Sequence, residues 1–85
     1  MEIDIIAKTK DQIIFCEVKT RADNIFGNPE EFVTKQKQMN IMRAADHYLR
    51  KNDIPLEARF DIIAIISNKE KFTLNHIPSA FSPRW

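Results

Sequence analysis

Runs of apolar residues separated by short polar segments divide this chain into a small set of predicted elements. Residues 2–7 and 12–19 are two mostly apolar runs joined by a polar tetrad, which is typical of a strand, a turn and a second strand. Apolar positions then recur with a helical period through residues 35–51. Apolar runs at residues 59–67 and 72–77 predict two further strands. This order predicts one α/β domain, a mixed sheet of about four strands with one main helix packed on one face.

The helix is expected to begin after Thr34, whose side chain can cap it, and to end at Asn52 and Pro55. Its apolar stripe consists of Met39, Met42, Ala45 and Leu49, widened by Ile41 and Tyr48. The strand that follows is apolar on both of its faces, which favours a central strand covered on both sides. A strand, a long helix and a strand in succession imply a right-handed parallel crossover.

Acidic side chains fall on one face of the predicted hairpin. Successive residues of a strand point to opposite faces, so Glu2 and Asp4 point the same way. Whether the turn centres on residues 9–10 or 10–11, an even-numbered residue pairs with an odd one, and Asp4 shares a face with Glu17. Glu2 lies opposite Glu17 in the first register, and Asp4 does so in the second. A slip by one residue would separate the acids, and it is costly because both strands are apolar.

This array predicts a metal-dependent phosphodiesterase. Carboxylates on strands about 4.8 Å apart can share a hard cation such as Mg²⁺ or Mn²⁺, which takes oxygen ligands and keeps several waters. Lys19 stands on the same face and would position the nucleophile or neutralise charge on phosphate. We therefore expect Asp4, Glu17 and Lys19 to be catalytic. The expected metal ligands are Asp4 and Glu17, assisted by Glu2 and by the carbonyl of Val18, whose side chain would anchor the strand in the core.

A simpler interpretation competes with a metal site. A Glu-x-Lys triplet arises by chance in about one chain in three of this length, and exposed strand ends often carry paired charges as solvated ladders. The placement of the charges favours a site, because the other positions of both strands are almost wholly apolar and an unpaired acid among them would be costly. Spacing and burial alone leave both interpretations open.

Four segments carry a resemblance to a known family. They are Glu-Ile-Asp-Ile-Ile-Ala at residues 2–7, Phe-Cys-Glu-Val-Lys-Thr-Arg at 15–21, Gly-Asn-Pro-Glu at 27–30 and Arg-Phe-Asp-Ile-Ile at 59–63. Together they resemble the YraN-type proteins, an uncharacterised bacterial family, over nearly the whole chain. That family resembles the PD-(D/E)xK nuclease superfamily, whose restriction-endonuclease-like fold is shared with archaeal Holliday-junction resolvases. The resemblance implies a Mg²⁺-dependent endonuclease-like domain that hydrolyses phosphodiester bonds in DNA, including branched or structured DNA.

The chain departs from the family at its beginning. Family members usually start with an acidic helix and an edge strand before the Glu-Ile-Asp segment, whereas this chain starts on that segment at Met1. We therefore expect residues 1–85 to be a single, N-terminally truncated nuclease-like domain that lacks one acidic ligand of the family. The strand at residues 2–7 would be left as a sheet edge, which favours a homodimer or an edge-paired oligomer.

Further residues near the predicted site are expected to contact nucleic acid. Arg21 follows on the active-site strand, and the start of the helix brings Lys35, Gln36 and Gln38 towards the phosphates. Helix N-termini also attract phosphate through free backbone N–H groups. Between these segments, residues 28–31 are typical of a short capped helical turn. The helix also bears Lys37, Arg43, Arg50 and Lys51, a run typical of a solvated surface, above all at Arg50 and Lys51.

Composition agrees with a small cytoplasmic domain. The net charge of +1 argues for no particular partner. The single cysteine, Cys16, excludes an internal disulfide framework and is interpreted as a buried small hydrophobe. No stretch is long enough to span a bilayer and no signal peptide is present, so no membrane partner is expected. Asp61 is interpreted as a satisfied structural acid, and His47 and His76 as structural or surface residues.

Two other functions stay open beside the nuclease. The first is a nucleic-acid-binding module that keeps the fold and grips phosphates through Lys19, Arg21 and Lys35 without cutting. The second is a structural or partner-binding subunit in which the charges form a salt-bridge cluster. Tight divalent-metal binding would separate the nuclease from both. Salt-dependent affinity for DNA without metal would favour the binding module, and DNA is expected as the partner in preference to RNA.

Overall fold

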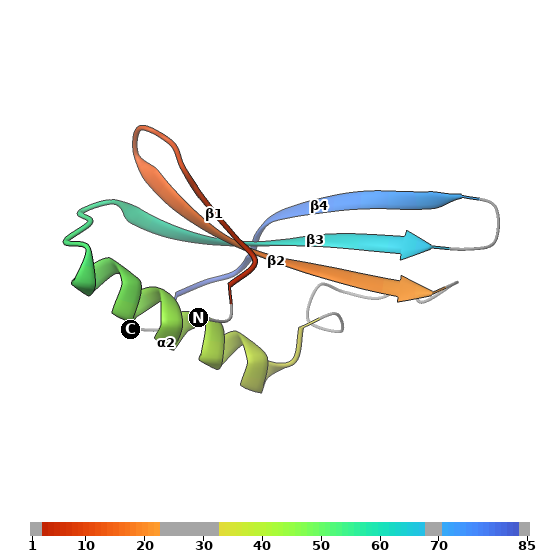
Figure 1. The fold of residues 1–85 in the computed structure, drawn as a ribbon, viewed down its shortest axis with the longest axis horizontal. Coiled ribbons are helices and arrows are strands. Elements are labelled where there is room, and N and C mark those ends of the chain that lie inside the picture. Colours follow the sequence, from red (N-terminus) through yellow and green to blue (C-terminus); the bar gives the residue numbers. More distant parts are fainter. Residues whose placement is uncertain (1–2, 23–32, 68–70, 84–85) are drawn as a thin grey trace.

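The computed structural model describes residues 3–22, 33–67 and 71–83 of the chain. Its elements are β1 (Ile5–Lys8), β2 (Gln12–Ala22), α2 (Lys35–Lys51), β3 (Glu57–Ser67) and β4 (Phe72–Phe81), shown in Figure 1. The strands lie in the sheet in the order β1-β2-β3-β4. The β2–β3 pair is parallel and the two outer pairs are antiparallel. The expected α/β architecture, a mixed four-stranded sheet with a main helix, is therefore confirmed.

The β1–β2 hairpin adopts the second of the two expected registers. Ile5 pairs with Cys16, so the turn centres on residues 10–11. Hydrogen bonds between Thr9 and Gln12 close the turn in both directions: the Thr9 N–H donates to the Gln12 carbonyl at 2.8 Å, and the Gln12 N–H donates to Thr9 Oγ1 at 3.0 Å. The hydroxyl thus replaces a backbone acceptor and holds the register on which the acidic residues depend.

The ends of α2 are capped as the sequence predicts. Thr34 Oγ1 accepts a hydrogen bond from the Lys37 N–H at 3.1 Å, and the Asn52 side-chain amide donates to the Tyr48 carbonyl at 2.9 Å. These bonds satisfy backbone groups that the ends of a helix leave without partners. In the part of the chain that the structure describes, no helix is long and apolar enough to cross a membrane.

The core lies between α2 and one face of the sheet (Figure 1). Its centre is a row of aromatic rings across three strands, Phe15 stacked on Phe60 with centroids 5.6 Å apart and Phe60 on Phe81 at 5.1 Å. Tyr48 of α2 meets Phe15 edge to face at 6.0 Å. The other buried apolar side chains of the core are Ile13, Val33, Ile41, Met42, Ala45, Ala58, Ile62 and Ala64.

The opposite face of the sheet differs from the expectation that β3 is covered on both sides. Ile65 is only partly buried there, and its partner Leu74 on β4 is 63% exposed. Phe72 on β4 is 76% exposed and Ile5 on β1 is 44% exposed. At this end of the sheet no described element covers the face, because α2 packs on the other one. Cys16 and Asp61, further along the same face, are buried.

The two edges of the sheet are β1 and β4. β1 occupies an edge as expected, and association through that edge remains a prediction. β4 is longer than expected, since it continues from residue 77 through Pro78 to Phe81. Pro78 is tolerated because an edge strand does not need every backbone N–H for pairing. The strand expected at residues 72–77 therefore extends to Phe81, with Ile77 paired to Ile62 and Phe81 paired to Phe60 on the side of β3 away from β1.

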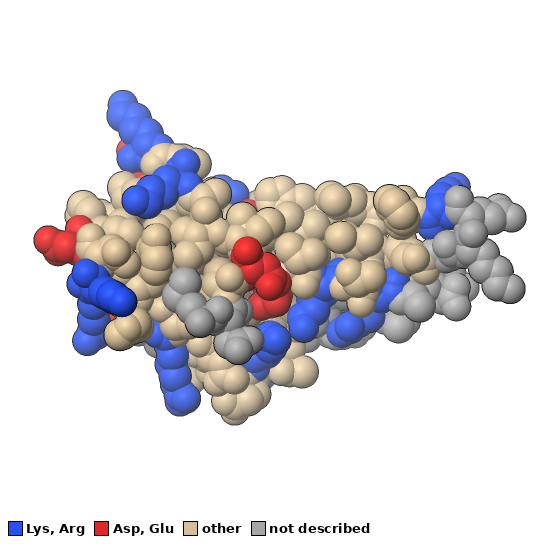
Figure 2. All heavy atoms as spheres, viewed as in Figure 1, with Lys and Arg blue, Asp and Glu red and all other residues tan. Residues whose placement is uncertain are grey.

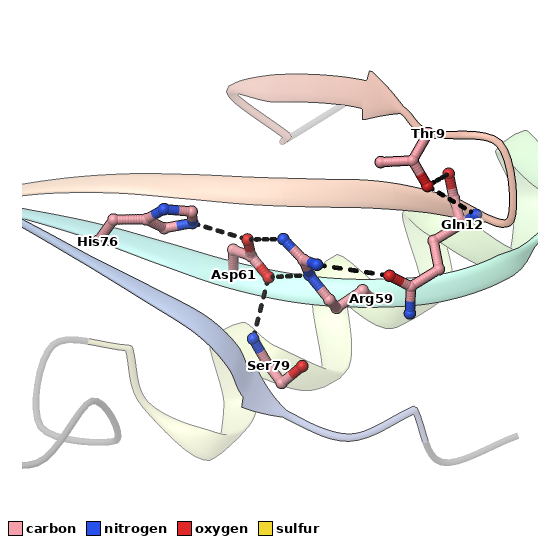
Figure 3. Close-up of polar contacts among 6 residues, drawn as sticks. All are labelled: Thr9, Gln12, Arg59, Asp61, His76 and Ser79. Atoms are coloured by element: carbon pink, nitrogen blue, oxygen red, sulfur yellow. Dashed lines mark hydrogen bonds and ion pairs between the residues drawn. The ribbon is translucent and has the colours of Figure 1, made fainter.

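Asp61 is a buried acid whose hydrogen bonds join β3 to β4 (Figure 3). Its carboxylate is 1% exposed and accepts from Arg59 Nε at 2.9 Å and a terminal Arg59 nitrogen at 2.8 Å. His76 Nε2 lies 2.7 Å from Asp61 Oδ2, and the Ser79 N–H donates to Oδ1 at 3.0 Å. Ser79 has a positive φ of 51° beside an irregularity in the strand pairing. Asp61 is thus the satisfied structural acid that the sequence indicated, and His76 is one of its partners.

We expect Asp61→Ala to destabilise the fold by about 3–5 kcal/mol, because removal of one member of a buried ion pair leaves the others unpaired. This is a large part of the roughly 5–15 kcal/mol that holds a domain together. Urea denaturation followed by circular dichroism measures the loss. The matched control is Asp46→Ala, since Asp46 pairs with Arg50 on the surface of α2 at 3.3 Å and should contribute less than about 1 kcal/mol. Equal stability of the two variants would show that the Asp61 cluster does not hold β4.

Candidate functional site

Asp4 and Glu17 meet at the amino end of β1. The pairing of Ile5 with Cys16 places the residue before β1 across from the residue after Cys16, so Asp4 faces Glu17. The Val18 N–H donates to Asp4 Oδ2 at 2.9 Å, which ties the acid to β2. Each acid shifts the pKa of the other, because the two side chains lie within hydrogen-bonding reach. Two carboxyl groups this close repel each other when both are ionised, which favours the protonated form of one of them.

Glu17 is unusual because it is buried and incompletely paired. It is 6% exposed, and its Oε2 has no hydrogen-bond partner among the described residues. Burial, followed by the hydrogen bond and the charge of Asp4, raises the pKa of Glu17 to about 7. The hydrogen bond from Glu17 and the Val18 N–H lower the pKa of Asp4. The proton of the pair therefore belongs mainly to Glu17.

Two lysines lie close enough to act on this pair. Lys19 follows Glu17 by two residues on the same face of β2. The positive charges of Lys37 and Lys19 act to lower the pKa of both acids, although for Glu17 burial and Asp4 outweigh them. Figure 2 shows a compact group of acidic atoms beside lysine and arginine atoms that extend towards the carboxyl end of β2. The site thus combines an acid pair, Glu17 buried and Asp4 exposed, with neighbouring positive charge.

Lys37 is the functional candidate that sequence reasoning placed on the solvated surface. It is partly buried and lies in the first turn of α2, three residues after the cap Thr34. The sequence spacing could have indicated this partial burial, because Lys37 precedes the buried Ile41 by four positions and therefore lies beside the buried stripe of the helix.

The acid pair fits a hard divalent cation. An orphaned carboxylate oxygen beside a second carboxylate offers the oxygen ligands that Mg²⁺ prefers, and a cation would replace the shared proton. No group of three or more potential ligand residues occurs among residues 3–22, 33–67 and 71–83. The expected third acid, Glu2, lies outside the described residues. The described part of the site therefore supplies two carboxylates, and waters would complete the coordination of Mg²⁺.

The remaining predicted site residues of β2 lie on opposite faces of the strand. Val18 is partly buried on the uncovered face and contributes its N–H to Asp4, so its side chain does not anchor the core as expected. Its role as a carbonyl ligand remains a prediction. Arg21 lies on the same face of β2 as Glu17 and Lys19 and is partly buried.

The three predicted contacts at the start of α2 behave differently from one another. Lys35 and Gln36 are exposed, and the Gln36 side-chain amide donates to Asn40 at 3.1 Å. Gln38 is 7% exposed, and its side-chain amide donates to the Val33 carbonyl at 3.1 Å. The buried side chain of Gln38 therefore stabilises the start of the helix, and its burial does not favour a contact with nucleic acid. The short helical turn expected at residues 28–31 lies outside the described residues.

Comparisons with known proteins agree on one family. A model of the uncharacterised protein family UPF0102 matches residues 1–65. A UPF0102 protein of Phocaeicola vulgatus is 46% identical over 82 residues, which are 96% of this chain and 68% of the relative. A UPF0102 protein of Christiangramia forsetii is 45% identical over 80 residues, 94% of this chain and 67% of the relative. One from Alkaliphilus oremlandii is 45% identical over 83 residues, 94% of this chain and 71% of the relative.

The raised pKa of Glu17 predicts a pH-dependent stability. Between pH 4.5, where the unfolded acid titrates, and about pH 7, the folded state keeps a proton that the unfolded state has released. Stability should therefore fall as the pH rises through this window, by about 2–3 kcal/mol for a shift of this size. The lowered pKa of Asp4 affects stability only below pH 3.8, so it does not change the stability between pH 4.5 and 7. Urea denaturation at pH 5 and pH 8 should show the loss in wild type and a much smaller one in Glu17→Gln. A parallel loss in both proteins would contradict the assignment to Glu17.

Proposed function

Because the chain belongs to the uncharacterised protein family UPF0102, whose name assigns no activity, we propose a function from the acid pair: a metal-dependent endonuclease-like domain that hydrolyses phosphodiester bonds in DNA. The observation that carries the proposal is the buried Glu17, whose Oε2 has no partner among the described residues while Asp4 is held against it. An acid in this state lowers stability, and such features are typical of sites kept for function.

Each residue of the site has a chemical task in this proposal. Asp4 and Glu17 would hold Mg²⁺ or Mn²⁺, and the Val18 N–H keeps Asp4 in the orientation needed. When bound, the cation polarises the phosphoryl group and lowers the pKa of a coordinated water. Lys19 orients the attacking water or neutralises charge that develops on the phosphate. Lys37 adds a second positive charge from α2, and this charge attracts an anionic substrate to the site.

Two features support a phosphodiester as the substrate. The acid pair lies among cations of β2 and α2, which suit a polyanion that would be repelled by the acids alone. The order of an acid before the hairpin and then Glu17-Val18-Lys19 on β2 is also the pattern that resembles the PD-(D/E)xK nucleases.

A binding module without catalysis is the second candidate. It is favoured by the presence of two described carboxylates where a nuclease site commonly has more, together with the cations Lys19 and Lys37 beside them. In that case the protonated Glu17 would remain a neutral hydrogen-bond donor, and affinity for DNA would not depend on metal.

Metal binding should stabilise the protein. Millimolar Mn²⁺ should raise the melting temperature, since a ligand at about 100 times its dissociation constant adds about 2.7 kcal/mol to the stability of the state that binds it. Asp4→Asn and Glu17→Gln should lose this response, whereas Asp46→Ala should keep it. A melting temperature that ignores Mn²⁺ in wild type would remove the metal from the proposal.

Lys19→Ala should lower cleavage by about 10²–10³-fold while the fold survives, as is typical when one charge-stabilising group is removed. Lys19→Arg should not restore the rate, because the guanidinium is a rigid planar fork and the ammonium a compact charge on a flexible stem. The assay compares duplex, single-stranded and branched DNA with Mg²⁺ or Mn²⁺, on this chain and on the longer relative from Phocaeicola vulgatus. Full activity of the alanine variant in whichever protein is active would show that Lys19 is not the catalytic cation.

A further inference from the structure

A groove along α2 lies outside the site described above. It has a volume of about 700 Å³ and is lined by Arg43, Ala44, His47, Tyr48, Lys51 and Asn52. Among the described residues the lining includes no acid, although Asp46 lies on the same helix. Asp46 is instead held by Arg50 at 3.3 Å on a neighbouring row of the helix. The groove therefore has a positive rim that no described acid neutralises from within.

Three side chains that can donate hydrogen bonds form a regular row along the groove. Arg43, His47 and Lys51 are spaced four residues apart, are all exposed, and lie about 6 Å from one another along the helix axis. A row of donors with a repeat of this size can follow a chain of phosphates. Isolated surface cations would be spread over several faces of the helix.

The floor of the groove is apolar and fixed. Tyr48 is partly buried and is held edge-on against Phe15 with ring centroids 6.0 Å apart, and Ala44 beside it is partly buried. A ring that is already packed loses little conformational freedom when a planar group stacks on it. An aromatic floor with a cationic rim is the combination that single-stranded nucleic acids use, because each unpaired base offers a flat face and each phosphate a charge.

The groove lies on the same side of α2 as Lys37. Lys37, which acts on Asp4 and Glu17, precedes Ala44 by seven residues, and seven residues bring the helix back to nearly the same face. The distance along the axis is about 10 Å at 1.5 Å per residue. A strand with one phosphate at the acid pair would therefore have its neighbouring nucleotides at the groove.

We propose that this groove binds a single-stranded segment of DNA, with Arg43, His47 and Lys51 on successive phosphates and Tyr48 beneath a base. The inference rests on the proposed function, since it names the form of DNA that the acid pair would meet. A duplex suits the groove less well, because its bases are stacked inside and cannot reach Tyr48. No acid of the described residues lines the groove, so its positive charge is available to phosphates.

The test measures binding of a fluorescein-labelled oligothymidylate by fluorescence anisotropy, in EDTA and at several salt concentrations. The variant is Arg43→Ala with Lys51→Ala, and the matched control is Arg50→Ala, which removes an exposed cation of the same helix that lies outside the groove. We expect the double variant to bind at least about tenfold more weakly at low salt and its log–log salt slope to fall by about 1.4, which corresponds to two lost phosphate contacts. The control should stay within about twofold of wild type on the same scale. Circular dichroism checks that both variants are folded.

The result separates the groove from the acid pair. Weak binding of wild type, wild-type affinity in the double variant, or equal losses in the double variant and Arg50→Ala would each overturn the groove. Tighter binding of a duplex of equal length would overturn the preference for a single strand. None of these measurements contains metal, so a failure of Mn²⁺ to stabilise the protein would reject the nuclease and leave the groove result in force.

Discussion

The burial of one face of β2 beneath α2 is the constraint on which the rest of the structure depends. Ile13 and Phe15 must both point into the core, and the alternation of a strand then carries Glu17 to the same face. A shift of one residue would expose both apolar side chains, so the sheet cannot relieve the acid by moving its register. The core therefore determines where the acid lies, and the hairpin register determines that Asp4 faces it.

The buried acid lowers the free energy of unfolding, and a bound cation would relieve this destabilisation. Glu17 is buried, its pKa is raised to about 7, and one of its oxygens has no partner among the described residues. The other buried acid, Asp61, is in the opposite state, since Arg59, His76 and the Ser79 N–H satisfy it. Two acids at similar depth thus differ because one is held by fixed donors and the other is not. The unsatisfied acid is the one beside a second carboxylate, and that contrast supports its functional assignment.

The positive charges around the acids belong to two separate elements. Lys19 comes with β2, whereas Lys37 and the groove cations come with α2, and the caps at Thr34 and Asn52 determine where that helix begins and ends. A proposed path for nucleic acid then follows from the packing of α2 across the sheet. The uncovered face opposite α2, with Leu74 and Phe72 exposed, takes no part in this path.

Much of the fold was predictable from the sequence, because strong periodicity marks α2 and the apolar strands. The hairpin left two registers open, and the structure adopts the one in which the Thr9 hydroxyl accepts from the Gln12 N–H, a contact that a periodic pattern does not specify. Lys37 and the burial of Gln38 were missed because both depend on how far the helix is rotated on the sheet. The partial exposure of Ile65 on β3 could not be predicted, because a fully apolar strand has the same sequence pattern whether one or both of its faces are covered.

The central claim is that Asp4 and Glu17 exchange a shared proton for a divalent cation. Isothermal titration calorimetry with Mn²⁺ at pH 7, repeated in two buffers of different ionisation enthalpy, measures both the binding and the proton released. With the pKa of Glu17 at about 7, the account predicts one site per chain and the release of about half a proton, both lost in Glu17→Gln. Absence of binding, or binding without proton release that persists in Glu17→Gln, would contradict it.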